Sequence, residues 1–350
     1  MRFVFFCLLL LEDNVMPELR HNVLTREWVI IATERAKRPQ DFAKELDKKK
    51  VIPSYVAECP FCRGNEKMTP PETYIVPGPD GWRIRVTPNK FSAVSYQGEL
   101  HRTFHGIRRT VSGVGIHEVI VETPDHSRTT ALLRDQEVET IIETYLNRFR
   151  FASADPRVQQ VTLFKNHGEA AGTSLEHPHS QMIATPVITA QLRDRLINSL
   201  KHFDEFGECL FCHVLEEELK EGSRVVLETE HFVSFVQFAA LTPFSILIMP
   251  RRHMACFIQI KDEEAADLAH ALRMTLAKLY HGLGNPDFNY TIRTAPSEYA
   301  GVKYHHWYLS IIPRLTKVAG FELGSGMFIN VSLPEENASF LRGVQVDEQR

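Results

Sequence analysis

Apolar residues recur at two different spacings along this chain, and each spacing predicts a different element. Residues 135–152 and 262–283 carry apolar side chains every three or four positions, and we expect amphipathic helices there, each with an Asp at its N-cap. Shorter runs dense in β-branched and aliphatic residues predict strands, namely HEVIVETP (117–124), SQMIATPVI (180–188), FSILIMPRR (244–252) and WYLSIIPRL (307–315).

These elements follow the same order in two halves of the chain. Each half begins with a C-x-x-C pair, continues with a strand followed by a histidine, and reaches a second histidine that opens another strand. The two histidines are 51 residues apart in the first half (His126, His177) and 53 in the second (His253, His306). We therefore expect a duplicated α+β fold, each half an antiparallel sheet with helices on one face.

Composition limits the class of protein. Of the 350 residues, 43% are apolar and 24% charged, which is typical of a folded, water-soluble protein and excludes collagen-like, coiled-coil and disordered chains. Lys and Arg number 40 against 44 Asp and Glu, a net charge of -4, so we expect no nucleic-acid partner.

The apolar start of the chain is too short to span a bilayer and lacks the small-residue cleavage site of a signal peptide. We interpret residues 1–15 as an N-terminal extension before a start at Met16, followed by domains at 16–192 and 193–345. A cytoplasmic protein with no membrane partner is expected.

Four of the six cysteines form two C-x-x-C pairs, too few for a disulfide framework but typical of a metal site. Thiolates and neutral imidazoles are the ligands that Zn²⁺ prefers, four in a tetrahedron. The alternative is two pairs of buried free thiols with histidines satisfied in the core. We predict two structural zinc sites, formed by Cys59, Cys62, His126 and His177 in one half and by Cys209, Cys212, His253 and His306 in the other.

The segment 164–181, FKNHGEAAGTSLEHPHSQ, carries the chemistry. His177 and His179 alternate along a predicted strand, so one can bind metal while the other faces a cleft. The glycines and serine before them form a loop of the kind that presents backbone N–H groups and a hydroxyl to phosphate oxygens. Gln181, two residues further, can donate to a phosphoryl oxygen without supplying a proton for hydrolysis. This pattern predicts covalent phosphoryl chemistry on an imidazole.

The run HPHSQ, with FKNHG and GTS before it, resembles the active-site signature of the galactose-1-phosphate uridylyltransferase family, a branch of the histidine triad superfamily. The resemblance extends from Met16 to about residue 340. It is strongest to the branch with two C-x-x-C pairs, which includes a plant enzyme acting on ADP-glucose. The further segments that follow in the family's order are TERAKRP (33–39), CPFC (59–62), RVTPNKFSAV (85–94), ETPDHS (122–127) and VAGFE (318–322).

The resemblance implies two histidine-triad-like halves and a ping-pong nucleotidyl transfer. His179 would attack the α-phosphorus of a nucleotide sugar and carry the nucleotidyl group to a second phosphate-bearing acceptor. The carbonyl of His177 would fix the tautomer of His179, so the metal positions and does not catalyse. The resemblance further implies catalytic roles for Gln181 and Ser174. Residues that it implies for substrate binding are Arg35, Arg38, Asn89, Asn166 and Gly172. For the two arginines, a solvated salt bridge is the alternative.

The second half has Tyr308 in the place of His179 and Ser310 in that of Gln181, so we expect one active site per chain. The family's usual substrates imply UDP-glucose with hexose 1-phosphate (galactose 1-phosphate), and the similar plant branch implies ADP-glucose with inorganic phosphate. After GFE the chain continues LGSGMFIN, without the family's galactose-recognising glutamine. A homodimer with arginines contributed across the interface is also implied.

Two other functional classes stay open. A histidine-triad hydrolase would carry a third histidine where Gln181 stands. A zinc-stabilised nucleotide-binding module would have no use for a nucleophilic imidazole beside a phosphate loop.

Overall fold

The computed structural model describes residues 16–32, 37–46 and 52–347. The predicted N-terminal extension at residues 1–15 lies outside the described residues, and so does Arg35. Among the helices of the described ranges, none combines the length and the apolar character that crossing a bilayer requires.

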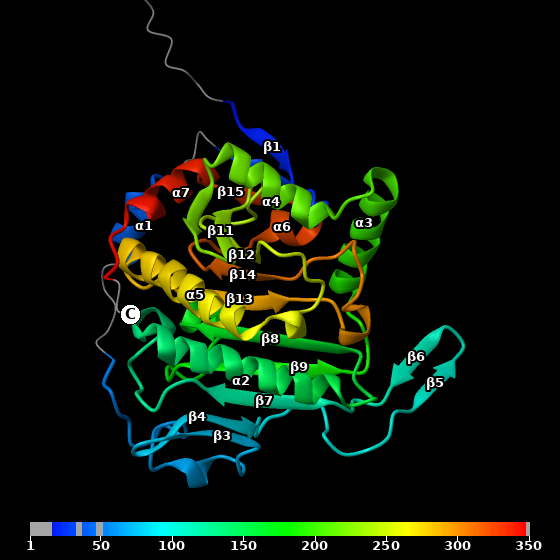
Figure 1. The fold of residues 1–350 in the computed structure, drawn as a ribbon, viewed down its shortest axis with the longest axis vertical. Helices are drawn as coiled ribbons and strands as arrows, with labels where there is room; N and C mark the ends of the chain where they lie inside the picture. Colours follow the sequence, from blue (N-terminus) through cyan, green and yellow to red (C-terminus); the bar gives the residue numbers. More distant parts are fainter. Residues whose placement is uncertain (1–15, 33–36, 47–51, 348–350) are drawn as a thin grey trace, which may run out of the picture.

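Both halves of the chain contribute five strands to one antiparallel sheet (Figure 1). The first half supplies β3 (Tyr74–Gly78), β4 (Gly81–Pro88), β7 (Ile116–Val121), β8 (Gln160–His167) and β9 (His179–Thr185). The second half supplies β10 (Val225–Glu228), β11 (Phe232–Val236), β12 (Ile246–Pro250), β13 (Phe288–Arg293) and β14 (Tyr308–Pro313). The strand order is β10-β11-β12-β14-β13-β8-β9-β7-β4-β3.

The duplicated α+β fold is confirmed, but the two half-sheets are not separate. β8 and β13 pair antiparallel, with Asn289 opposite Asn166 and Tyr290 opposite Lys165. Each of these strands would otherwise be the edge of its half-sheet, with a row of unpaired N–H and C=O groups. Residues of the second half therefore lie directly beside the segment of the first half that carries the predicted chemistry.

Two long helices, α2 (Asp135–Ser153) and α5 (Asp262–Leu283), cover one face of the sheet, as the apolar spacing predicts. The prediction of an Asp at each N-cap is wrong. The N-cap residues are Arg134 and Lys261, and each donates its backbone N–H to the Glu side chain three positions later, at 2.9 Å in both helices. The aspartates are the first helical residues, where a carboxylate stabilises the helix N-terminus.

The expectation of helices on one face only is wrong for the second half. Every residue of β11 and β12 is buried, so both faces of these strands need an apolar cover. The second cover is α4 (Leu210–Glu221), which follows α3 (Ala190–Phe206) and packs Leu210, Phe211 and Leu215 against Val233, Phe235 and Met249.

The smaller elements lie around this sheet. β15 (Phe328–Asn330) runs parallel to β2 (Trp28–Ile31), which pairs with β1 (Glu18–His21), so the N-terminal hairpin is joined to the C-terminal segment. The remaining elements are the projecting hairpin of β5 (Arg102–His105) and β6 (Arg108–Val111) and the helices α1 (Pro39–Leu46), α6 (Gly320–Ser325) and α7 (Pro334–Gly343).

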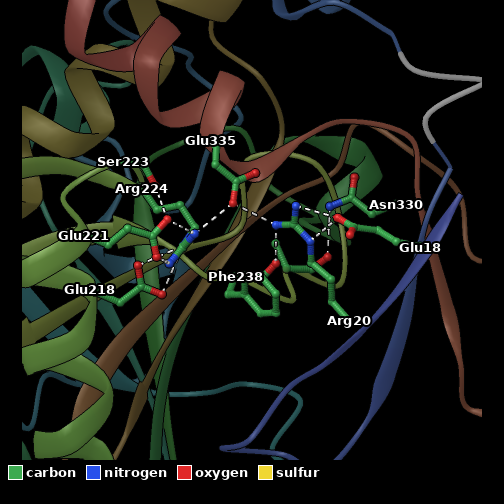
Figure 2. A network of polar contacts seen from close by, with 10 residues as sticks. Glu18, Arg20, Glu218, Glu221, Ser223, Arg224, Phe238, Asn330 and Glu335 are labelled. Atoms are coloured by element: carbon green, nitrogen blue, oxygen red, sulfur yellow. Dashed lines mark hydrogen bonds and ion pairs between the residues drawn. The ribbon is translucent and has the colours of Figure 1, made fainter. Parts of the chain in front are cut away.

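Two buried arginines tie the N-terminal hairpin to the second half (Figure 2). Arg20 on β1 and Arg224 before β10 both donate to Oε1 of Glu335 on α7, at 2.8 Å each. Arg224 also donates to Glu218 on α4 at 2.9 Å. Both guanidinium groups lie over the ring of Phe238, 4.4 and 5.2 Å from its centroid. The network links β1, α4 and α7.

Carboxylates outnumber guanidinium groups in this network. Burial raises the pKa of Glu218 to about 7, in spite of the opposing charge of Arg224. Glu218 is therefore the member that takes up a proton as the pH falls below neutral. The carboxylates that contact the two arginines are Glu18, Glu218, Glu221 and Glu335.

Glu218→Gln is expected to raise the free energy of unfolding at pH 8 by about 1–2 kcal/mol. The folded pKa is raised above the unfolded value of about 4.3. The free energy of unfolding of the wild type therefore falls progressively as the pH rises from about 4 to 7. The gain in this free energy from the substitution should shrink toward zero at low pH.

Urea unfolding at pH 4.5, 6 and 8 measures this difference, with Glu216→Gln, an exposed position on the same helix, as the matched control. A gain that is the same at every pH, or that also occurs in the control, contradicts the prediction.

Candidate active site and metal centres

The first C-x-x-C pair lies on a loop, as predicted, and the fold brings two histidines to it. Cys62 Sγ lies 3.4 Å from His126 Nδ1 and 3.6 Å from His177 Nδ1, and Cys59 Sγ lies 3.7 Å from His177 Nδ1. The N–H of Cys62 donates to the carbonyl of Cys59 at 3.3 Å, which closes the turn between the two thiols. All four predicted ligands are buried and face one another.

The second group is built differently. Cys209 is the N-cap of α4 and Cys212 lies in the first turn of that helix. His253 follows β12 and His306 precedes β14, and their Nδ1 atoms lie 3.3 and 3.4 Å from Cys212 Sγ. The four predicted ligands of the second half are therefore also brought together.

Both groups fit a tetrahedral metal ion. Zn–S and Zn–N bonds of about 2.3 and 2.0–2.1 Å give a tetrahedral S···N edge of about 3.6 Å. The five S···N contacts of the two groups measure 3.3 to 3.7 Å. Four protein donors leave no coordination position for a substrate, so each group is suited to a structural ion.

The histidines have the protonation and the outer contacts that metal ligands need. Burial lowers the pKa of His177 to about 4 and that of His306 to about 3, so both imidazoles are neutral at pH 7. His177 Nε2 donates to the carbonyl of Thr123 at 2.8 Å, and His253 Nε2 to that of Val302 at 3.1 Å. Such contacts fix the ring orientation of a ligating histidine.

His179 opens β9 on the face of the sheet opposite α2 and α5, because the alternating residues Met182 and Ala184 lie in the core beneath those helices. Its side chain is 6% exposed and its ring centroid lies 5.1 Å from that of Phe61. Nδ1 donates to the carbonyl of His177 at 2.8 Å. A carbonyl only accepts, so this bond places the proton on Nδ1 and leaves the lone pair on Nε2.

Burial lowers the pKa of His179, against the raising effect of that hydrogen bond. The ring is therefore neutral at pH 7. A buried neutral imidazole with a fixed tautomer and an unprotonated Nε2 is a competent nucleophile.

A second imidazole, His117 on β7, orients Gln181. His117 Nδ1 accepts the N–H of Ala93 at 3.0 Å, so the proton is on Nε2, which donates to Gln181 Oε1 at 2.9 Å. Asn89 Nδ2 donates to the same oxygen at 3.3 Å. Because its oxygen is held in this way, the amide NH₂ of Gln181 is the group that it offers to a ligand. The structure thus brings together Asn89 and Gln181, two residues chosen from the sequence.

Beneath β9, on the face covered by the helices, lies a buried ion pair between Glu122 and Lys165, which are 3% and 1% exposed. Tyr145 donates to Glu122 at 2.6 Å, and the hydroxyls of Ser180 and Tyr290 join the same cluster. Burial raises the pKa of Glu122, but the charge of Lys165 and its hydrogen bond outweigh this and lower it below the ordinary value. The cluster anchors the strand that carries His179.

The loop after β8 does not offer its backbone N–H groups to phosphate, although the sequence led us to expect this. Gly168 and Gly172 have φ of +86° and +84°, and a Cβ at Gly168 would overlap the carboxylate of Asp287. The N–H groups of residues 170–173 are all bound within the protein, the first to Asp287 at 2.7 Å and the others to carbonyls of the loop. They are not available to phosphate, and the loop presents the exposed Ser174 instead.

Asn166 is held by a residue of the second half. Asn289 Nδ2 donates to Asn166 Oδ1 at 2.8 Å and to the carbonyl of Ala171 at 2.9 Å. Lys165 pairs with Ser180 across β8 and β9, so Asn166 lies one step further along, at the level of His179. This places its side chain on the same face of the sheet as the imidazole.

Arg38 is not brought to this site within one chain. It is exposed at the start of α1, where its N–H donates to Asp41 at 3.1 Å. It lines a surface hollow with Glu336 and Phe340 of α7. Since α1 packs on α5, Arg38 and His179 lie on opposite sides of the sheet.

Tyr308 opens β14 as His179 opens β9. Its ring packs on that of Phe211 at 5.6 Å, inside the apolar cluster under α4, and the side chain is 4% exposed. The second half therefore repeats the group of two thiols and two imidazoles, but it has no counterpart of the His179 imidazole.

Comparison with known proteins decides the family. Residues 9–189 match the galactose-1-phosphate uridyl transferase N-terminal domain, and residues 195–342 match the galactose-1-phosphate uridyl transferase C-terminal domain. The chain belongs to the galactose-1-phosphate uridylyltransferase family. This confirms the resemblance drawn from HPHSQ, and a nucleotidyltransferase is the class of enzyme that the family supports.

Two relatives within this family carry different names. The chain is 37% identical to an ADP-glucose phosphorylase of Arabidopsis thaliana over 95% of either chain. It is 30% identical to a galactose-1-phosphate uridylyltransferase of Thermotoga maritima, over 95% of this chain and 100% of the relative. A crystal structure of the Arabidopsis thaliana enzyme with bound ADP-glucose superposes with a TM-score of 0.79 at 33% identity, covering 95% of this chain and 100% of that one.

The sequence alone did not indicate His117, Asn289 or the Glu122–Lys165 pair. His117 opens the strand-like run HEVIVETP, and its alternation with Val119 and Val121 was the available signal. Asn289 had none, because it reaches this uridylyltransferase-family site only through the pairing of β8 with β13.

Lys165→Met is expected to lower the free energy of unfolding by about 3–5 kcal/mol, because it leaves the carboxylate of Glu122 buried without its counter-charge. Urea unfolding measures this loss. Lys201→Met, an exposed lysine on α3, is the control and should stay within about 0.5 kcal/mol of the wild type. Equal losses of unfolding free energy in both variants would contradict a stabilising role of the Glu122–Lys165 pair.

Metal content tests the two four-donor groups. We expect two ions per chain by elemental analysis and one after either Cys59→Ser or Cys209→Ser, because each removes a donor from one group. Cys256→Ser changes a buried free thiol outside both groups and should keep both ions. Retention of both ions by Cys59→Ser, or loss of one in the control, would refute the assignment.

Proposed function

We propose that this protein transfers a nucleotidyl group from a nucleotide sugar to a phosphate-bearing acceptor through a covalent nucleotidyl-His179. The observation that carries the proposal is the hydrogen bond from His179 Nδ1 to the carbonyl of His177, which leaves Nε2 unprotonated in a buried neutral ring.

In the first half-reaction, Nε2 of His179 attacks the α-phosphorus, and an N–P bond forms as the bond to the bridging oxygen breaks. The leaving group is a sugar 1-phosphate. In the second half-reaction, an oxygen of the acceptor phosphate attacks the same phosphorus and the N–P bond breaks. The Nδ1 proton stays on the ring, where the His177 carbonyl stabilises the positive charge of the phosphorylated imidazole.

The remaining predicted residues have roles that their positions support. The Gln181 amide, with its oxygen held by His117 and Asn89, donates to the phosphoryl oxygens as negative charge develops. Asn166 and the Ser174 hydroxyl hold phosphate oxygens. Gly172 contributes its carbonyl or Cα surface, since its N–H donates to Glu169.

Zinc is the ion that we propose for both four-donor groups, on the chemistry of two thiolates and two imidazoles in each. When bound, it supplies rigidity at His177 and at the start of α4. The homodimer stays a prediction, as does substrate binding by Arg35 and Arg38. The position of Arg38 across the sheet from His179 is in keeping with a contribution to the site of a second subunit.

Two nucleotide sugars are candidate donors. UDP-glucose, with galactose 1-phosphate or another hexose 1-phosphate as acceptor, is supported by the relative from Thermotoga maritima, which this chain matches over its full length. ADP-glucose with inorganic phosphate is supported by the 37% identity to the Arabidopsis thaliana enzyme. The absence after GFE of the glutamine expected for galactose recognition favours the second pair.

The intact mass of the protein after brief mixing with UDP-glucose, and separately with ADP-glucose, tests the mechanism and the donor. We expect a mass increase of one nucleotidyl group with one of the two sugars, and none in His179→Ala. Tyr308→Phe changes the counterpart residue of the second half and should keep the adduct.

A uridylyl adduct supports the uridylyltransferase reaction, and an adenylyl adduct supports phosphorolysis of the ADP-sugar. An adduct that persists in His179→Ala would end the proposal. No adduct with either sugar, together with tight binding or slow hydrolysis, would return the protein to the binding-module or hydrolase classes.

A further inference from the structure

A small hollow lies on the same face of the sheet as His179, where the two halves of the chain meet. It has a volume of about 30 Å³ and is bounded by β8, β13 and the first turns of α3. Its polar lining includes Thr162, Thr291, Arg195, Arg293 and His305. Thr162 and Asn166 are four residues apart on β8, so the hollow is roughly 13 Å from the level of His179.

The two arginines of the hollow have no counter-charge. Arg293 donates to the Oε1 of Gln191 at 3.3 Å, and Arg195 donates to the carbonyl of the same residue at 3.5 Å. Neither forms an ion pair with a carboxylate in the part of the chain that the structure describes. Burial and the neighbouring charge of Arg195 both lower the pKa of Arg293.

Further polar atoms in the hollow lack partners. His305 is 1% exposed, and neither of its ring nitrogens makes a hydrogen bond within the described residues. The same holds for the buried Nε of Arg195. Unpaired buried polar atoms are costly, and here they lie beside two half-buried guanidinium groups that have no carboxylate partner among the described residues. This combination around a cavity indicates a bound species that supplies acceptors and negative charge.

The position of the hollow follows from the duplication. Arg293 pairs with Tyr308 across β13 and β14, and Asn166 lies at the level of His179 across β8 and β9. Arg293 is therefore the second-half counterpart of Asn166. Where the first half has an amide beside an imidazole, the second half has a guanidinium beside a phenol.

We propose that this hollow is an anion-binding site, separate from the active site, that takes a compact inorganic anion no larger than phosphate. Arg195 and Arg293 supply the charge, and Thr162 and Thr291 supply hydroxyl donors. The anion joins α3 to the two strands at the meeting point of the halves. Binding to the folded state alone makes it a stabilising ligand.

Thermal unfolding tests this site with phosphate, sulfate, chloride and bromide as separate additions, at ionic strength held constant with sodium gluconate, which is too large for the hollow. We expect at least one of these anions to raise the Tm of the wild type by about 2–5 °C. Arg195→Gln and Arg293→Gln should lose this rise. The matched control is Arg193→Gln, an exposed arginine on the same helix, which should keep it.

Two measurements separate this site from the active site and from simple packing. His179→Ala should keep the anion-dependent rise in Tm, because the hollow does not include that residue. In gluconate alone, Arg195→Gln should be at least as stable as the wild type, because it removes a repulsive charge.

Crystals soaked in sodium bromide should show an anomalous peak between Arg195 and Arg293 that is absent in Arg195→Gln. The proposal is overturned if no peak occurs there, if the Arg195 and Arg193 variants respond equally to every anion, or if Arg195→Gln is destabilised in gluconate and still keeps the full response.

Discussion

The antiparallel pairing of β8 with β13 is the interaction on which the rest of this structure depends. It removes the exposed edge of each half-sheet and makes one surface of ten strands. Through it, Asn289 reaches Asn166 and the phenol of Tyr290 joins the cluster under β9. The proposed active site, which the sequence places in the first half alone, is therefore supported by side chains from both halves.

Duplication has produced two halves with equal scaffolding and different chemistry. Each half keeps two thiols, on a loop in the first half and at the start of α4 in the second, and two imidazoles close to the ends of matching strands. The residue two positions after the last metal ligand is an imidazole in one half and a phenol in the other, His179 and Tyr308. The two four-donor groups could each hold a metal ion beside these strands. In the proposed mechanism, the residue two positions further decides whether a half can form a bond to phosphorus.

The two faces of the sheet differ in how their ionisable groups are compensated. On the face covered by the helices, Glu122 and Lys165 are paired and surrounded by hydroxyls, so β9 has a rigid support. On the other face, burial keeps the ring of His179 neutral, as a nucleophile requires. Further along the same face, Arg195 and Arg293 form no ion pair with a carboxylate among the described residues, and we propose that a bound anion supplies the opposite charge.

The sequence by itself determined the α+β class, the two long helices, the duplication, the family and the members of both four-donor groups, because these depend on periodicity, motifs and spacing along the chain. Only the tertiary structure decided the fusion of the half-sheets, the helix α4 on the second face, and the contacts of His117 and Asn289. It also decided that the N–H groups of residues 170–173 are used internally and that Arg38 lies across the sheet from His179. Those features depend on which strand edges meet and which donors find partners. Residues far apart along the chain decide both, as when Asn289 reaches Asn166, 123 positions away.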